Sequence, residues 1–351
     1  MNTKKVLLYG CLLIIGVAAP FIFPAFKLQI SYLYILIILA LTWDVQGGQM
    51  GYNSFGNIVF FGVGMYLCAS IQIGMFFPLA EWTAGGGEKT FVHSPQQYFQ
   101  GISVGLILAG IVPMLIAGVI GYGILGLRGH YFAICTLGLA VAAGEIVGGI
   151  ELLGAGQGMT TPPWPKGIGD TELRSEFFYY NCLILMIATF CFLRWAYKTR
   201  FGLVLNAIRD NEEKAEAMGI PTMRYKIIGW MVSAFFVGIA GGLMGNMVGY
   251  IEPVEIAFAG STLGVFMVLM AILGGKGTLW GPVIGATVFH VFKEGFWTYF
   301  LGWQFVALGL LIIVIVVFFP EGIMGWFREK YPEWFGEKVD DSDRTAQVDL
   351  K

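Results

Sequence analysis

Long apolar runs separated by short polar segments dominate the hydropathy pattern of this chain. A helix that crosses a bilayer needs about 20 mostly apolar residues, and ten runs reach or approach that length. The sequence therefore predicts an all-α, polytopic integral membrane protein with about eight to ten transmembrane helices. The candidate spans are 6–26, 30–45, 55–77, 101–125, 131–153, 177–197, 227–250, 260–275, 278–294 and 300–319.

Two of the shorter runs, 260–275 and 278–294, flank the glycine-rich stretch LGGKGTLWG. They could form a re-entrant pair or two broken helices, because irregular backbone at membrane depth is tolerated where protein or a cavity surrounds it. We therefore expect short or broken helices in the Gly-rich regions. The first run, 6–26, has the length of a retained span rather than of a cleaved signal peptide.

One segment between two apolar runs is densely charged: residues 200–226 read RFGLVLNAIRDNEEKAEAMGIPTMRYK. Asp210 followed three residues later by Glu213 has the pattern of a capping box, and Gly219 followed by Pro221 is a typical helix stop. Between them we predict a helix of about eight residues, which is too short to cross a bilayer and marginal in water on its own. This helix is either a docking surface for a soluble partner or part of a solvated loop.

The side chains of this short helix are mixed in character. Ala215 and Met218 would form a small apolar strip, while Glu212 and Glu216 would share another side at the i, i+4 spacing. Such a mixture suits a helix that sits in a cleft of another protein. It is equally compatible with an ordinary charged loop.

Basic residues are distributed unevenly between the two sides that these spans define. Ten crossings with an internal N-terminus place 16 of the 21 lysines and arginines on the inner side, and lysine and arginine favour cytoplasmic loops. We therefore expect a multi-pass protein of the cytoplasmic (inner or plasma) membrane with both termini and the segment 198–226 in the cytoplasm. The membrane domain is expected over 1–326, and a polar, disordered cytoplasmic tail over 327–351.

Glycine is enriched within the apolar runs, and the chain has 50 glycines in all, about twice the average share. In the stretch FFVGIAGGLMGNMVGY, several glycines stand four residues apart. This spacing clears one helix face, so that a neighbouring backbone can approach closely. The glycines expected to pack against another helix are Gly238, Gly241, Gly242, Gly245 and Gly249.

Polar side chains near membrane depth are costly and tend to mark transport pathways. Such residues cluster around the start of the third apolar run, and Glu145 lies within the fifth, where it needs a partner or a watery face. The cluster could equally be an ordinary cytoplasmic turn. The candidates for a translocation pathway are Gln49, Asn53, Ser54, Asn57 and Glu145.

Composition supports the membrane class and narrows the chemistry. The chain is 57% hydrophobic and only 13% charged, about half the charged share of a soluble domain, and its mean hydropathy is +0.73. The net charge of −2, without a basic tract, gives no indication of nucleic-acid binding. The five cysteines lie within apolar runs without metal-ligand spacing, so no metal site is predicted.

No catalytic pattern stands out either. GGKGT is not a phosphate-binding loop, because Lys276 is followed by Gly277 rather than by Ser or Thr. No Ser/His/Asp arrangement appears, and the three histidines are scattered. We expect a chain that is not an enzyme and that binds no cofactor.

The charged segment, followed by SAFFVGIAGGL, resembles the cytoplasmic loop and next span of LivM-type permease subunits of branched-chain amino acid ABC transporters. Four further stretches resemble this family and stand in the same order, so that the similarity covers about residues 30–325. They are GYNSFGNIVFFGVGMY, LRGHYFAICTLGLA, GGKGTLWGPVIGA and ALGLLIIVIVVFFPEGIMG.

The resemblance implies a permease subunit that carries leucine, isoleucine or valine delivered by an external binding protein. It implies a second, related permease subunit and two cytoplasmic ATPase subunits that bind and hydrolyse the ATP. By the same resemblance, EAMGI corresponds to the coupling loop that rests on an ATPase. The coupling candidates are Arg209, Asp210, Glu212, Glu216, Ala217 and Gly219.

Two alternatives remain open. A permease subunit of a urea or short-chain amide importer would share these motifs. The other alternative, from a different class, is a stand-alone secondary transporter or a membrane enzyme. A secondary transporter would usually show inverted repeats, and a membrane enzyme would need convergent catalytic groups.

Overall fold

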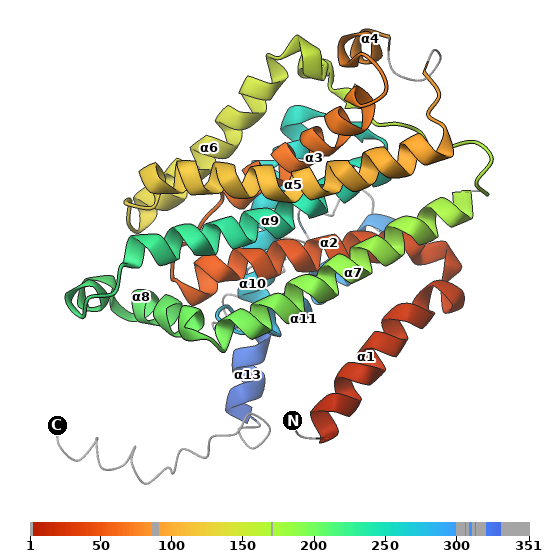
Figure 1. The fold of residues 1–351 in the computed structure, drawn as a ribbon. Coiled ribbons are helices and arrows are strands. Elements are labelled where there is room, and N and C mark those ends of the chain that lie inside the picture. The colour runs from red at the N-terminus through yellow and green to blue at the C-terminus, as the bar shows by residue number, and fades with distance from the viewer. Residues whose placement is uncertain are drawn as a thin grey trace, which may run out of the picture.

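The computed structural model describes residues 3–85, 91–169, 171–299, 306, 309–310, 313 and 321–330. Most of them are helical, and a two-stranded antiparallel sheet of β1 (Met159–Thr160) and β2 (Tyr250–Ile251) joins two loops. The predicted all-α fold is confirmed (Figure 1). The α-helices are α1 (Thr3–Ile22), α2 (Lys27–Asp44), α3 (Asn57–Gly74), α4 (Leu79–Ala84), α5 (Pro95–Ile124), α6 (His130–Gly148), α7 (Thr171–Tyr197), α8 (Arg200–Ala217), α9 (Thr222–Val248), α10 (Val265–Gly274), α11 (Gly281–Tyr299) and α13 (Gly322–Lys330).

Seven helical stretches among the described residues are long and apolar enough to cross a membrane. A shorter apolar helix, Leu13–Ile22, lies within α1, and α11 adds 19 helical residues. The predicted span 300–319 falls almost wholly outside the described residues. The seven stretches are Pro24–Gln49, Asn57–Gly74, Pro95–Ile124, His130–Gly148, Glu172–Tyr197, Thr222–Val248 and Pro253–Gly274.

Irregular helical turns occur at three places, and two of them are glycine-containing, as predicted for the Gly-rich regions. A π-helical turn, Val45–Gln49, extends α2, and two more, Pro253–Ala257 and Gly260–Gly264, precede α10. Such turns place backbone groups out of the regular ladder and are frequent at functional sites. They also explain why two runs looked short: each continues as an irregular helix beyond its apolar core.

The predicted boundary at residue 326 falls inside a helix. Residues 327–330 continue α13 rather than beginning a disordered tail, which corrects that prediction for these four positions. The start of α13 is held by a close contact, because a Cβ on Gly322 would lie 2.4 Å from the backbone nitrogen of Gly275. Residues 331–351 lie outside the described residues.

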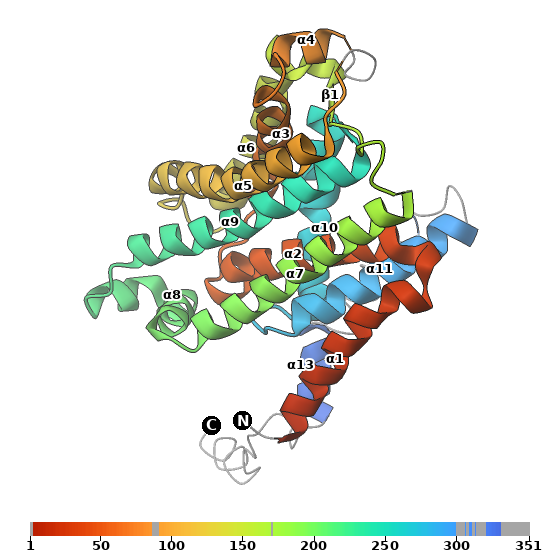
Figure 2. The same ribbon diagram turned by 45° about the vertical axis from the view of Figure 1, so that its right-hand side comes forward.

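Helices α3, α5 and α9 pack backbone against backbone, and we call them the α3–α5–α9 group (Figures 1 and 2). A Cβ on Gly64 would lie 2.1 Å from the carbonyl oxygen of Gly238, and one on Gly238 would lie 2.0 Å from that of Ala109. A Cβ on Gly241 would lie 2.1 Å from the carbonyl oxygen of Phe61. Only glycine permits these approaches.

The remaining glycines of the α9 series differ in role. Gly242 faces Cys68 and Leu106, and Gly245 faces Met65, so both lie against side chains of the neighbouring helices. Gly249 is not a packing residue: it ends α9 with φ +88°, a left-handed conformation that favours glycine. The four-residue spacing of the glycines therefore predicted one packing position too many, at the end of α9.

Helices α2, α7, α10 and α11 form the other part of the molecule, the α2–α7–α10–α11 group. The pair α10 and α11 is a tight hairpin, since a Cβ on Gly274 would lie 1.7 Å from the carbonyl oxygen of Gly281. The two groups meet along α2 and α9, where Ser233 Oγ donates a hydrogen bond to the carbonyl oxygen of Thr42 at 2.9 Å.

Alternate connections gather at opposite ends of the bundle. We call the end formed by 45–56, 125–129, 198–221 and 275–280 the α8 end, after the helix that lies there (Figure 1). The opposite end carries α4 and the small sheet, where Trp82 Nε1 donates to the carbonyl oxygen of Thr160 at 3.0 Å. This arrangement is the alternation that successive crossings of a membrane produce.

Candidate functional site: the short helix and the polar cluster behind it

The charged segment at the α8 end contains a break within α8. Asn211 has extended backbone angles, φ −166° and ψ 105°, so the helix divides into 200–210 and a short helix, 212–217. The Asn211 side chain accepts a hydrogen bond from the Lys214 backbone N–H at 2.9 Å and is thus the N-cap. The predicted cap at Asp210 is wrong by one residue, and Asp210 instead pairs with Arg209 at 3.2 Å.

The short helix ends where the sequence predicted. Gly219 adopts φ +83°, and its N–H donates to the carbonyl oxygen of Glu216 at 2.9 Å. The Ile220 N–H donates to the carbonyl oxygen of Ala215 at 3.1 Å, which completes a glycine-type helix stop. The chain then turns directly into α9.

Most of the coupling candidates face outward, but one does not. Arg209, Asp210, Glu216, Ala217 and Gly219 are exposed. The side chain of Glu212 is only 11% exposed. The structure thus places this carboxylate behind the helix rather than on its outer surface.

The expected apolar strip is divided in the same way. Ala215 is buried against the body of the protein, whereas Met218 is 83% exposed at the tip of the short helix. Met218 thus presents a large apolar side chain on the outer surface of the short helix. The segment therefore has an inner face that attaches it to the protein and an outer face that is free in this chain.

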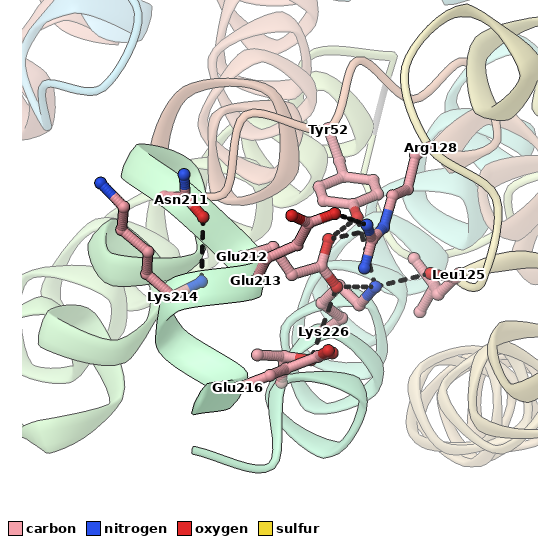
Figure 3. A network of polar contacts seen from close by, with 10 residues as sticks. Tyr52, Leu125, Arg128, Asn211, Glu212, Glu213, Lys214, Glu216 and Lys226 are labelled. Carbon is pink, nitrogen blue, oxygen red and sulfur yellow. Dashed lines mark hydrogen bonds and ion pairs between the residues drawn. The ribbon is translucent and has the colours of Figure 1, made fainter. Parts of the chain in front are cut away.

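Glu212 lies at the centre of a polar cluster drawn from four segments of the chain (Figure 3). Its carboxylate accepts a hydrogen bond from Lys226 Nζ at 2.7 Å and a short one from the Tyr52 hydroxyl. Arg128 Nε lies 3.5 Å from the same carboxylate, and Thr222 Oγ1 lies 3.4 Å from it. The residues come from the loop before α3, the α5–α6 loop, the short helix and the start of α9.

Lys226 is the most buried charge of this cluster, with 3% of its side chain exposed. Besides Glu212, its ammonium group donates to the carbonyl oxygen of Leu125 at 2.7 Å and lies 4.8 Å from the centre of the Tyr52 ring. A buried charge is tolerated only where such partners replace water. The cluster satisfies that condition.

The pKa of Glu212 follows from these contacts. Burial alone would raise the pKa, but the hydrogen bonds from Lys226 and Tyr52 and the charges of Lys226 and Arg128 outweigh it, so the pKa lies below its ordinary value. Glu212 is therefore an anion throughout the physiological range. Two of its hydrogen-bond donors in this cluster, Lys226 and Tyr52, are 14 and 160 residues away in sequence.

Two further contacts fasten the short helix. Thr222 Oγ1 donates to Glu216 at 2.6 Å, so both carboxylates of the predicted i, i+4 pair turn towards the start of α9. Arg128 Nη1 donates to Glu213 at 3.0 Å, but both of these side chains are mostly exposed, at 51% and 80%. Exposed pairs of this kind contribute little.

The candidates for a translocation pathway differ in burial and in their contacts. Ser54 and Asn57 are buried between helices: Trp43 Nε1 donates to the carbonyl oxygen of Ser54 at 2.7 Å, and Trp230 Nε1 donates to Asn57 Oδ1 at 3.2 Å. Gln49 is also buried, whereas Asn53 is exposed. Their role in translocation stays a prediction.

Glu145 is separate from that cluster. It lies in the last turn of α6, which ends at Gly148, and its side chain is exposed. Glu145 thus lies within a candidate span, as predicted, but near its end. The apolar run continues past the end of the helix, so the residue is closer to the helix end than to the end of the run.

A second contact at the α8 end was not predicted. The buried Asp44 accepts a hydrogen bond from the Gly277 N–H at 2.7 Å, so the GGKGT stretch contacts the end of α2. Arg209 lies beside this point, since a Cβ on Gly277 would be 3.3 Å from Arg209 Nη1. The signal in the sequence was an acidic residue at the end of an otherwise apolar run. No group of three or more potential metal ligands occurs among the described residues.

Comparisons with known proteins identify the family. Residues 28–319 match the family described as branched-chain amino acid transport system / permease component. The high-affinity branched-chain amino acid transport system permease protein LivM of Salmonella typhimurium (strain LT2) is 26% identical over 93% of this chain and 76% of its own length. The protein of the same name from Escherichia coli (strain K12) is 25% identical over the same shares.

A shorter match shows that the family is broader than one substrate. The guanosine ABC transporter permease protein NupQ of Bacillus subtilis (strain 168) is 31% identical over 36% of this chain and 40% of its own length. No solved structure matches the chain significantly. Because the family match covers most of the sequence, the predicted resemblance is confirmed, and the chain belongs to the branched-chain amino acid transport permease family as a multi-pass, non-catalytic transport component.

Proposed function

We propose that this chain is a permease subunit of an ATP-binding cassette importer that translocates leucine, isoleucine and valine. The two LivM proteins, which are similar over 93% of the chain, support this substrate class. A second permease subunit, an external binding protein and two ATPase subunits complete the importer, and the ATPases hold the ATP.

The observation that carries this proposal is the capped short helix with its exposed tip. Met218 projects from the α8 end, flanked by the exposed Glu216 and Gly219. A cleft with an apolar floor and a basic rim on an ATPase would complement this tip. The α8 end is then cytoplasmic, in agreement with the concentration of lysine and arginine in its connections.

The substrate is tested by uptake into vesicles that contain the complex of this chain, its permease partner, the ATPases and the binding protein. We expect ATP-dependent uptake of labelled leucine that unlabelled isoleucine and valine inhibit. Inhibition by urea or a short-chain amide alone would show that the chain belongs to a urea or short-chain amide importer instead. Inhibition by guanosine alone would place it with nucleoside importers.

The docking role is tested in the same complex with Gly219→Trp. The substitution puts a large ring at the tip, so the ATPases should no longer co-purify and uptake should cease. Gly167→Trp is a matched control at the opposite end, because Gly167 also has a positive φ, +102°, and open space around it. Normal ATPase capture by Gly219→Trp, or equal loss in both variants, would contradict docking at this tip.

A further inference from the structure

Neighbouring residues of the short helix have opposite surroundings. The Glu213 side chain is 80% exposed, whereas that of Glu212 is 11% exposed and bonded to Lys226 and Tyr52. A residue turned inward in this way has little surface to offer an ATPase. Glu212 therefore requires a role other than the coupling contact expected from the sequence.

The partners of Glu212 lie beside the ends of α3, α5 and α9. Tyr52 lies on the loop between the turn after α2 and the start of α3, Arg128 lies between α5 and α6, and Lys226 lies near the start of α9 and also donates to the Leu125 carbonyl at the end of α5. These are the three helices of the α3–α5–α9 group, whose backbones touch at Gly64 and Gly238. The cluster thus attaches the short helix to this tightly packed unit, while the backbone N–H of Tyr52 also donates to the carbonyl oxygen of Gln46, in the turn after α2, at 2.8 Å.

On its other side, the short helix is joined to the rest of α8 by an irregular residue. Asn211 interrupts the helical hydrogen bonding with its extended conformation. Near the end of the preceding segment, 200–210, Arg209 lies beside Gly277, which is bonded to Asp44 of α2, and beside Gly51 of the loop between α2 and α3. The segment before Asn211 therefore lies against the α10–α11 turn and the end of α2.

We propose that the Glu212–Lys226 ion pair holds the short helix rigidly against α9, to which the chain already joins it at 218–221, so that the short helix moves the α3–α5–α9 group with Asn211 as the hinge. Glu212 and Lys226 act as positioning residues, because both side chains are turned inward, at 11% and 3% exposed, and bond to each other. Displacement of the tip by an ATPase would carry α9, and with it α3 and α5, past α2 and α7. This inference rests on the proposed function and deepens it.

The physical reason lies in the cost of separating the two charges. Lys226 and Glu212 have exchanged water for each other, and removing one partner leaves a buried, unpaired charge. The exposed pair of Arg128 and Glu213 lacks this property, because water replaces either partner. Of these two pairs, only Glu212–Lys226 can transmit a displacement without separating first.

The experiment uses the complete reconstituted importer with three variants of this chain. Glu212→Gln removes one charge, and Glu212→Gln with Lys226→Met removes both, so that the double variant leaves no unpaired charge. Glu213→Gln is the matched control on the same helix. For each we measure ATPase capture, thermal stability in detergent, ATP hydrolysis, and the number of solute molecules imported per ATP.

We expect all variants to capture the ATPases. Glu212→Gln should lower the solute imported per ATP by about tenfold, within the range of coupling between distant sites. The double variant should regain stability while the import ratio stays low, and Glu213→Gln should behave as wild type. A purely structural role predicts instead that the import ratio recovers together with stability.

Three results would overturn the inference. These are recovery of the import ratio in the double variant, an unchanged ratio in Glu212→Gln, and loss of ATPase capture by Glu212→Gln, which would make it a docking contact. Failure of the proposed function is distinguishable, because then the wild-type complex itself would capture no ATPase or import no branched-chain amino acid.

Discussion

Glu212 and Glu213 are adjacent acidic residues, and the difference between them is set by residues remote in sequence. Local spacing placed Glu212 correctly on one side of a short helix with Glu216. It could not show that Lys226 and Tyr52 would meet that side, because those contacts depend on how α3 and α9 converge. Similarly, Met218 was expected to pair with Ala215, but only Ala215 found a packing surface.

The lowered pKa of Glu212 predicts how acid affects stability. Its ordinary value is 4.5, and the folded value is lower, so the folded protein keeps this carboxylate ionised more readily than the unfolded chain does. The stabilisation is complete above pH 4.5 and is lost as the pH falls through the folded pKa. The difference in melting temperature between wild type and Glu212→Gln should therefore be constant from about pH 6 to 8, a range well above the ordinary pKa. In acid this difference should fall towards zero.

The control for this measurement is Glu213→Gln, whose side chain is mostly exposed and pairs with a half-exposed arginine. Its melting temperature should stay near that of wild type over the same range. If the difference in melting temperature between wild type and Glu212→Gln became larger in acid, the ion-pair interpretation would be contradicted.

Among the elements, the glycine spacing of α9 allows a direct test of backbone packing. Gly238→Ala would put a Cβ 2.0 Å from the Ala109 carbonyl oxygen, and this overpacking should cost about 1–3 kcal/mol of stability or prevent folding. Gly138→Ala on α6 is the control, because nothing lies within 4 Å of its Cβ. Thermal unfolding of both variants should show a loss for the first and none for the second.

Element boundaries were predictable where residues themselves break a helix and were missed where tertiary contacts do. Gly219 stopped the short helix as expected, since few other residues adopt a positive φ easily. The start was misplaced by one residue because Asp210 and Asn211 are both good caps, and only the fold selects between them. The π-helical turns were anticipated only as irregular backbone, because hydropathy does not report hydrogen-bond register.

For the whole molecule, the sequence indicated crossings but not their grouping. The membrane class, most spans and the alternation of ends followed from apolar length alone. The division into an α3–α5–α9 group and an α2–α7–α10–α11 group did not, because it depends on which glycines meet which backbones across 100 or more residues. The same limit explains why Asp44 and Gly277, from opposite halves of the chain, were not linked.

This grouping predicts how distances change during transport. Spin labels at Lys214 and Gly126 would measure a distance within one moving unit, since both positions lie beside the Glu212 cluster. Labels at Lys214 and Lys276 would measure a distance across the hinge at Asn211. All three labelled residues are exposed. On trapping the complete importer with ATP, the first distance should remain constant and the second should shift. In Glu212→Gln the first distance should broaden, because the helix is then released from α9. A change in the first distance in wild type, or equal changes in both, would mean that the short helix moves independently of the α3–α5–α9 group.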